Sequence, residues 1–465
     1  MPGTQTLGAR FARLLTFNVL ANLSVPLAGL IDVAMLGHLA EIRHFAGVAL
    51  GSVVFDYLYW TAGALRMATT GLTAQAVGRG APDESARVLL RAVLTGGVCG
   101  LLLLALRTPL TAAAFALLEG SPAVEAAGEA YVKARILGAP AVLINLALLG
   151  WFLGRAEGRV VLAMTAVANL SNGLLDYVFI LRWGLGAQGA GLATMIGQYL
   201  SLAVALSFAL RRRTPAGGWR RVLDPAPARS MLRLGGNIVV RTVCLTSAFA
   251  LFTNWSAWLG TTVLAANAIL LRVVTTAAYL VDGAAYATES LAGIAFGRRD
   301  ATALRRLLHM SLITGLGCEL LVAAAVIALP SALLGVLTSH GEVLGRATAE
   351  RWWLLPVMIP GALAYIYDGF FLGLTQGRIL RNAMLASLVV FLVPGWWAAH
   401  HSSNHGLWAA LALFMVARAW LLHRRRAPLL ALRPKTLAVA PGRSSSPQQP
   451  VRASRQGCEL RSPYE

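Results

Sequence analysis

The sequence predicts an all-α polytopic membrane protein with about twelve transmembrane helices in two six-helix bundles, related by a pseudo-two-fold axis along the membrane normal. Three observations support this fold class. The 465 residues are 57% hydrophobic and only 13% charged, whereas soluble domains average about 25% charged residues. Apolar stretches long enough to cross a bilayer recur along the whole chain. The second half of the chain also repeats the first at one constant offset.

Each transmembrane helix requires roughly 20 predominantly apolar residues. Runs of this kind lie near 14–38, 45–66, 88–107, 130–151, 160–182, 189–210, 231–257, 263–285, 303–328, 350–373, 379–399 and 405–423. The first run is too long for the apolar core of a signal peptide and lacks a cleavage pattern. We therefore expect it to be retained as the first span.

The distribution of arginine predicts the orientation of these spans. With twelve spans, the Arg-rich connections all fall on one side; they contain Arg10, Arg13, Arg79, Arg87, Arg155, Arg159, Arg211 to Arg213, Arg220, Arg221, Arg298, Arg299, Arg305, Arg306, Arg378, Arg381 and Arg424 to Arg426. The positive-inside rule makes that side cytoplasmic. We therefore expect a multi-pass protein of the cytoplasmic (inner) membrane with both termini in the cytoplasm. The opposite connections contain Glu41, Glu119, Glu125, Glu129, Glu342, Glu350, His400, His401 and His405.

The net charge of +20 comes mainly from these loops and the C-terminal tail. Anionic lipid headgroups are the expected neighbours of such cations, and nucleic acid is not an expected partner.

A shift of 219 residues aligns the two halves of the chain. It places Asn18 on Asn237, Gly78-Arg79 on Gly297-Arg298, and Gly158-Arg159 on Gly377-Arg378. The predicted organisation has four parts. They are an N-terminal six-helix bundle (1–210), a cytoplasmic linker (211–230), a C-terminal six-helix bundle (231–423) and a basic, disordered cytoplasmic tail (424–465). Transporters built from such parallel repeats bind substrate between the halves, although a duplicated channel or scaffold would have the same pattern.

One polar stripe lies on the first span. Its members share a sector of roughly 80° on a helix; they are Asn18, Asn22, Gly29 and Asp32. The stripe carries no cation, so the Asp32 carboxyl is suited to bind and release a proton. Pro26 should let the helix kink or flex nearby, because proline lacks an N–H and clashes with the preceding turn. A purely structural role for both residues is the alternative.

The fifth and sixth spans carry further polar residues. Asn169, Asn172 and Asp176 share one helix face, and Thr194 and Gln198 lie one turn apart on the next span. Together with the first span they predict a hydrated polar pocket inside the N-terminal half. The alternative is that these amides only join neighbouring helices.

Other ionisable residues inside the spans are secondary candidates; they are Asp56, Arg66, Arg241, Arg272, Asp282, Glu289 and Asp368. For the three arginines a structural salt-bridge network is the favoured interpretation. For Asp282, Glu289 and Asp368, gating and ion coupling both stay open.

The chain contains none of the sequence motifs typical of soluble enzymes. There is no P-loop, HExxH or GxSxG motif and no Cys/His metal spacing. The cysteines Cys99, Cys244, Cys318 and Cys458 share no short spacing. We expect no enzyme activity, no catalytic residues, no bound metal and no cofactor, and any transport would draw on an ion gradient.

Several segments together resemble the multidrug and toxic compound extrusion (MATE) family, and specifically its DinF-like branch. They are NVLANLSVPLAGLIDVAMLGHL, LRMATTGLTAQAVGRG, LLGWFLGRAEGR, NLSNGLLDYVFI, QGAGLAT, LAANAILLRVV, YLVDGAAYATESLAGIAFGRRD and YDGFFLGLTQGRILRNAM. The resemblance implies twelve helices in two bundles around a central cleft that alternates between inward-open and outward-open states. It also implies export of cationic or amphipathic compounds in exchange for protons or sodium.

The resemblance assigns roles to individual residues. It implies that Asp32 is the protonation site, that Pro26 is the bendable proline, and that Asn172, Asp176 and Thr194 belong to the same site. The sodium-coupled branch carries an acid in the seventh span, whereas no acid lies between Met231 and Trp258 here. Proton coupling is therefore expected, with sodium as the alternative because Asp368 could form a secondary cation site.

The sequence thus predicts a monomeric secondary antiporter in the lipid bilayer, exporting small amphipathic or cationic drugs or toxins in exchange for protons. A flippase or exporter of a lipid-linked precursor is the alternative within transport. A membrane scaffold is the alternative outside it.

Overall fold

The computed structural model describes residues 6–39, 41–118, 120–212 and 218–430. Every regular element in these ranges is a helix, and twelve helical segments are long and apolar enough to cross a membrane. The predicted fold class is therefore confirmed. The predicted basic tail lies, from residue 431 onward, outside the described residues.

The first half of the chain contains six of the membrane-length segments. They are α1 (Leu7–Gly37), α2 (Ile42–Gly78), α3 (Pro82–Ala105), α5 and α6 (Pro122–Arg135 and Ala139–Gly154, joined by the 3-10 turn η1, Ile136–Gly138), α7 (Gly158–Asp176, continued by the π-helix η2, Tyr177–Arg182) and α8 (Gly186–Leu210). The short α4 (Arg107–Leu117) precedes α5, and α9 (Gly218–Val222) follows α8.

The second half contains the other six. They are α10 (Pro225–Trp258), α11 (Thr261–Arg298), α12 (Ala301–Ala328), α14 and α15 (Gly341–Glu350 and Leu354–Gly373, joined by the 3-10 turn η3, Arg351–Trp353), α16 (Gly377–His400) and α17 (Asn404–Arg425). Two further short helices are α13 (Pro330–Leu334) and α18 (Ala427–Leu430).

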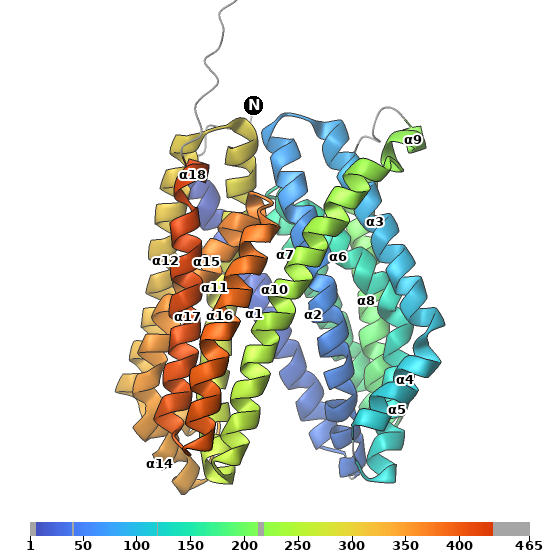
Figure 1. The fold of residues 1–465 in the computed structure, drawn as a ribbon. Coiled ribbons are helices and arrows are strands. Elements are labelled where there is room, and N and C mark those ends of the chain that lie inside the picture. Colours follow the sequence, from blue (N-terminus) through green and yellow to red (C-terminus); the bar gives the residue numbers. More distant parts are fainter. Residues whose placement is uncertain (1–5, 40, 119, 213–217, 431–465) are drawn as a thin grey trace, which may run out of the picture.

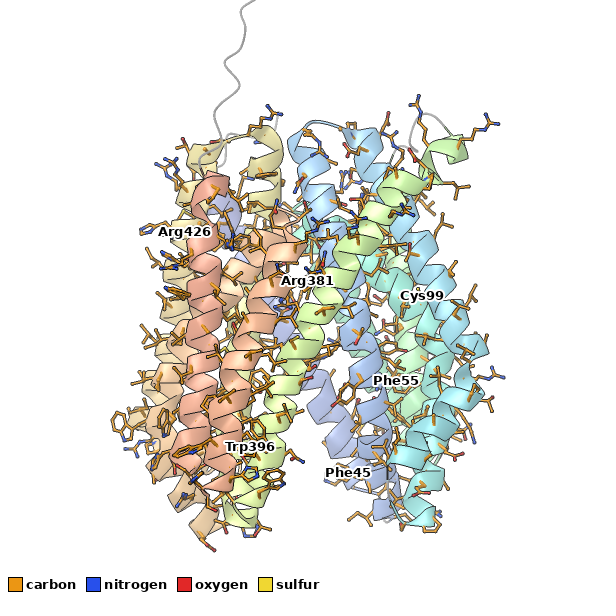
Figure 2. The ribbon with its side chains drawn as sticks, viewed as in Figure 1. Phe45, Phe55, Cys99, Arg381, Trp396 and Arg426 are labelled. Atoms are coloured by element: carbon orange, nitrogen blue, oxygen red, sulfur yellow. The ribbon has the colours of Figure 1, made fainter. Side chains whose placement is uncertain are left out.

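The two halves stand side by side, and the start of α1, α9 and α18 lie at the same end of the molecule (Figure 1). We call this the basic end, because the Arg-rich turns after α2, α6 and α11 belong to it. Figure 2 shows Arg381 and Arg426 towards this end, and Phe45 and Trp396 towards the opposite end. The arrangement agrees with the predicted alternation of basic and acidic connections.

Side-chain caps start several helices. Asp224 accepts a hydrogen bond from the Ala226 backbone N–H at 3.1 Å, and Asp300 accepts one from Ala303 at 2.9 Å. Each cap pairs a backbone N–H that has no partner within its helix. Two long helices, α10 and α12, therefore begin at defined residues at the basic end.

One continuous apolar core joins the two halves at the basic end. It contains Phe11 and Ala68 of the first half together with Leu234, Leu291 and Phe370 of the second. In this region α1 and α2 pack against α11, and α2 also packs against α10 and α15. The basic end is therefore closed.

Towards the opposite end the large apolar cores belong to one half each. Leu36, Phe55 and Tyr131 lie in a core of the first half alone, whereas Phe252 and Trp408 lie in one of the second half alone. Among the described residues, the hydrogen bond between halves that lies furthest from the basic end is that from Asn22 to the Tyr279 carbonyl. The molecule thus adopts a state that is sealed at the basic end.

Candidate functional site

Two carboxyl groups meet inside the N-terminal half. The side chains of Asp32 in α1 and Asp176 at the end of α7 lie within hydrogen-bonding range of each other. Two ionised carboxylates this close repel each other, so the arrangement favours a proton on one of them. Asp176 is fully buried and Asp32 is half-buried. The pair can therefore hold one proton away from bulk water.

Neighbouring polar groups fix the position of Asp176. The side-chain amide of Asn172 donates to Asp176 Oδ2 at 2.8 Å and faces the Thr194 hydroxyl oxygen at 3.5 Å. The α-helix changes to the π-helix η2 directly after Asp176, and local π-helix is frequent at functional sites. Four of the predicted site residues, Asp32, Asn172, Asp176 and Thr194, are thus brought together.

A small cavity lies beside this cluster. It has a volume of about 50 Å³, and its walls include Thr194, Gln198, Tyr59 and Arg135. This is enough space for water, which needs roughly 15 Å³ on the same measure. A space for water therefore lies within the first half, bordered by Thr194 of the cluster.

Arg135 is the residue that sequence reasoning missed here. Its guanidinium interacts electrostatically with Asp32 and lies 4.5 Å from the Phe55 ring centroid. The polar stripe of α1 itself carries no cation, but Arg135 of α5 brings a positive charge close to Asp32. In the sequence Arg135 lies close to Glu129 and Lys133, and a cluster of charges at the end of a span is typical of the membrane interface. Only the packing of α5 against α2 and α8 turns Arg135 inward.

The remaining predicted amides bond elsewhere. Asn18 and Asn22 donate to the carbonyls of Gly283 and Tyr279 across the interface, each at 3.3 Å. Asn169 donates to Ser24 Oγ at 2.7 Å, and Gln198 accepts from Asn145 at 3.1 Å. These four residues join helices, which is the alternative that the sequence left open. Pro26 lies inside α1, between Ser24 and Asp32.

Asp368 in the C-terminal half is held by two arginines. Its Oδ2 accepts from Arg241 Nε at 3.1 Å and also from terminal nitrogens of Arg241 and Arg418. All three residues are buried, and Arg418 is fully so. Burying a charge is costly unless it is paired and hydrogen-bonded. Two guanidinium groups therefore occupy the space around Asp368 in which a metal cation would have to bind.

A second buried ion pair joins the halves. Arg66 of α2 lies 3.4 Å from Glu289 of α11, and its guanidinium sits 4.3 Å from the Tyr286 ring centroid. Asp282 interacts electrostatically with both Arg66 and Arg241. The favoured salt-bridge network thus includes Arg66 and Arg241.

The network does not extend to every secondary candidate. Arg272 is exposed and forms no ion pair with the described residues, and Asp56 is also exposed. The structure adds Glu319 of α12, which is buried and interacts electrostatically with Asp282. Sequence reasoning missed Glu319 and Arg418, because neither has a partner nearby on its own helix.

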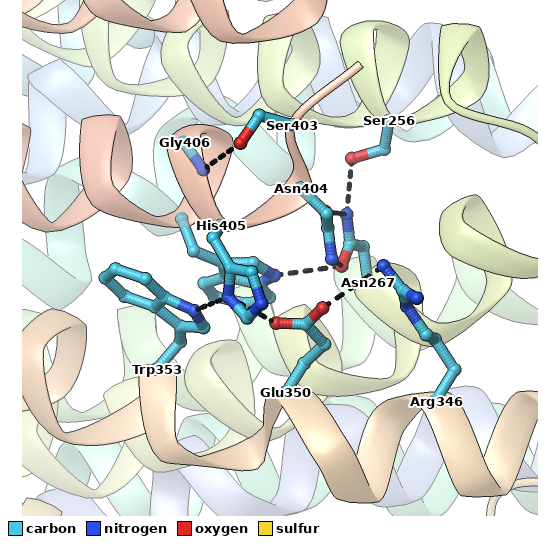
Figure 3. Close-up of polar contacts among 10 residues, drawn as sticks. Ser256, Asn267, Arg346, Glu350, Trp353, Ser403, Asn404, His405 and Gly406 are labelled. Carbon is cyan, nitrogen blue, oxygen red and sulfur yellow. Dashed lines mark hydrogen bonds and ion pairs between the residues drawn. The ribbon is translucent and has the colours of Figure 1, made fainter. Parts of the chain in front are cut away.

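The opposite end of the C-terminal half is tied by a polar network (Figure 3). The Asn267 amide donates to Ser256 and Asn404 at 2.8 and 2.7 Å. Glu350 pairs with Arg346 at 3.3 Å and lies 3.2 Å from Nδ1 of His405. The network connects α10, α11, α14 and α17. It supports the C-terminal half as one body. No cluster of His, Cys, Asp and Glu suited to a metal occurs in the described part of the chain.

A model of the MatE family matches the chain twice, over residues 18–178 and 238–397. The chain belongs to the MatE family. This identification confirms the resemblance seen in the sequence. Members of this family are transporters and not enzymes, so this chain is a multi-pass membrane transporter of the multidrug efflux type.

Curated relatives of this MatE chain match over most of their length. It is 33% identical to DNA damage-inducible protein F of Escherichia coli, covering 86% of the chain and 88% of the relative. It is 26% identical to protein DETOXIFICATION 44 of Arabidopsis thaliana, covering 92% and 84%.

Solved structures agree on the fold. A MOP superfamily transporter from Pyrococcus furiosus superposes with a TM-score of 0.84 at 18% identity, covering 92% of this chain and 97% of that one. An outward-facing conformation of a MATE family multidrug resistance transporter superposes with a TM-score of 0.82 at 18% identity, covering 91% and 97%.

Proposed function

We propose that this transporter is a proton-driven antiporter that exports amphipathic or cationic compounds by alternating access. The observation that carries the proposal is the contact between Asp32 and Asp176, supported by Asn172 and beside a water-sized cavity. A carboxyl pair of this kind can gain or lose a single proton without leaving two adjacent negative charges buried. The coupling site would then lie wholly within the N-terminal half.

Protonation would act on the shape of α1. Neutral Asp32 can form a hydrogen bond with the Asp176 carboxylate, whereas ionised Asp32 is repelled by an ionised Asp176. Pro26 interrupts the hydrogen bonding of α1 less than two turns before Asp32, so the segment from Pro26 to Gly37 can change direction. Entry of a proton would thereby displace substrate from the space next to α1, and release of the proton at the basic side would reset the helix.

Proton coupling is preferred to sodium coupling because of Asp368. Its carboxylate already accepts hydrogen bonds from Arg241 and Arg418, so a sodium ion would compete with two fixed positive charges. Arg66 is likewise paired with Glu289, and Arg241 with Asp368. A cationic cleft for a lipid-linked precursor is therefore less well supported than export of cationic or amphipathic compounds.

The basic end is proposed to face the cytoplasm, which places both termini on the cytoplasmic side of the inner membrane. The state described here would then be closed to the cytoplasm. We propose a monomer as the working unit, because the carboxyl cluster and both halves of the cleft come from one chain.

Growth of a pump-deficient bacterial host on toxic lipophilic cations tests the proposal. The wild-type protein should protect the host, and Asp32→Asn should not. Glu129→Gln, which removes an exposed carboxylate paired with Lys133, is the matched control and should protect fully. Equal protection by Asp32→Asn and the wild type would remove Asp32 from the mechanism.

A further inference from the structure

A cavity of about 170 Å³ lies at the basic end, where the two halves meet. Leu72 of α2 contributes one wall, and Ser230, Arg233 and Asn237 of α10 contribute another. Gln376 and Arg378 close the third side at the turn between α15 and α16. The volume greatly exceeds the roughly 15 Å³ that a single water requires on the same measure.

The charge of this cavity has one sign. Arg233 and Arg378 line it, and no Asp or Glu does. Among the described residues, neither guanidinium forms a hydrogen bond or an ion pair. The neighbouring Arg381 instead donates to Asn237 Oδ1 at 3.0 Å and so fixes that amide. Two unpaired cations therefore face a cavity with polar amide and hydroxyl groups on its walls.

The internal repeat shows how the surroundings of Arg378 differ from those of the equivalent arginine in the first half. The shift of 219 residues places Arg378 on Arg159 and Gly236 on Phe17. The Arg159 guanidinium lies 5.8 Å from the Phe17 ring centroid. A side chain added at Gly236 would meet no atom within 4 Å. The C-terminal half thus lacks the aromatic ring that accompanies the equivalent arginine in the N-terminal half.

We propose that this cavity binds a phosphate group, carried by an anionic phospholipid headgroup or by free phosphate. Arginine forms charge-assisted hydrogen bonds with phosphate oxygens, and basic pockets between transmembrane helices at the cytoplasmic side are suited to lipid headgroups. Gln376 and Ser230 can supply neutral hydrogen bonds to the same oxygens.

The occupant would favour the closed basic end. Leu72 belongs to one half and Arg233 and Arg378 to the other, and Gln75 donates to Thr375 at 3.1 Å beside the cavity. Separation of the halves at this end would remove one wall. A ligand that binds one conformation better shifts the equilibrium towards it, so the bound phosphate would slow opening to the basic side.

Native mass spectrometry of the detergent-solubilised full chain tests the proposal. Phosphatidylglycerol, phosphatidylcholine and inorganic phosphate are added separately to the wild type, to Arg233→Gln/Arg378→Gln and to the control Arg159→Gln/Arg306→Gln. The control removes two exposed arginines from the same end without touching the cavity. We expect the cavity variant to retain the anionic ligand about tenfold less well than the control.

The three ligands identify the source of the phosphate group. Selective loss of phosphatidylglycerol supports a lipid headgroup, and selective loss of inorganic phosphate supports a free anion. Arg233→Lys/Arg378→Lys should retain most of the binding, and a size-exclusion profile establishes that each variant is folded. Equal retention of every ligand by the Gln cavity variant and its control would overturn the proposal.

Discussion

Gly78 of α2 and Gly297 of α11, which are equivalent under the 219-residue repeat, pack against each other across the interface between the halves. A Cβ on Gly78 would lie 3.0 Å from the Gly297 Cα and 2.2 Å from the Ile294 carbonyl oxygen. The two helices therefore meet backbone against backbone near the pseudo-two-fold axis. In lipid, the hydrophobic effect contributes little to helix association, so helices depend on close van der Waals packing. Small residues such as glycine allow the backbones to approach closely enough for this packing.

A larger residue at Gly78 should prevent closure of the basic end. We expect Gly78→Val to cost about 1–3 kcal/mol of the closed state and to abolish export. Gly63→Val on the same helix is the control, because a side chain there meets no atom within 4 Å. The measurement is maleimide labelling of Ser290→Cys, on the buried face of α11 between Gly283 and Gly297, with the native cysteines replaced. Slow labelling in both Gly variants would contradict this role.

The ion pair between Arg66 and Glu289 should stabilise the same closed state. Arg66→Met leaves Glu289 buried without its partner, which costs about 3–5 kcal/mol when the group stays charged. We expect a lower midpoint of thermal unfolding and faster labelling of the Ser290→Cys reporter.

The double variant Arg66→Met/Glu289→Gln removes both charges and should recover most of the stability. If the double variant is as unstable as the two single changes added together, the residues do not act as a pair.

Asp368 should be structural and should not bind sodium. Asp368→Asn leaves Arg241 and Arg418 without their carboxylate, so we expect a loss of several kcal/mol and poor yield of folded protein. Sodium should raise the unfolding midpoint of the wild type no more than choline does at equal ionic strength. A sodium-specific stabilisation would reinstate a cation site in the C-terminal half.

Asn172 should be required for coupling. Its amide hydrogen bond to the Asp176 carboxyl is worth about 1.5–3 kcal/mol when the acceptor is charged, so Asn172→Leu should lower export about tenfold or more. Thr165→Val on the same helix removes a hydroxyl that donates only to the Val161 carbonyl, and it should leave export unchanged. Drug efflux from loaded cells measures both variants, and an equal effect of the two would argue for a general disturbance of α7.

The number and order of the membrane helices were predictable because lipid imposes a simple rule on run length and polarity. The helix ends were not. The second predicted span stops near residue 66, whereas α2 continues to Gly78. Hydropathy detects contact with lipid, but Thr69 and Thr73 are buried against α6 of the same half, and Gly71, Ala74 and Gln75 are buried against the other half. The helix therefore continues where the apolar signal ends.

The candidate site was predictable in part for a related reason. Asn172 and Asp176 lie one turn apart, so helix periodicity alone places them together. Arg135, Glu319 and Arg418 gain their neighbours from distant helices, and no local spacing indicates which charge faces which. Asn18 and Asn22 follow the predicted stripe of α1, but the stripe turns towards α11 at that depth. Helix periodicity gives a face and does not give its neighbour.

Proton flux in proteoliposomes tests the central claim most directly. A pH-sensitive dye inside vesicles that contain the wild type should report proton movement when a transported cation is added, at the same rate with or without sodium. Asp32→Asn should give no substrate-dependent flux, while Glu129→Gln should match the wild type. Flux that persists in Asp32→Asn, or that requires sodium in the wild type, would contradict proton coupling through Asp32.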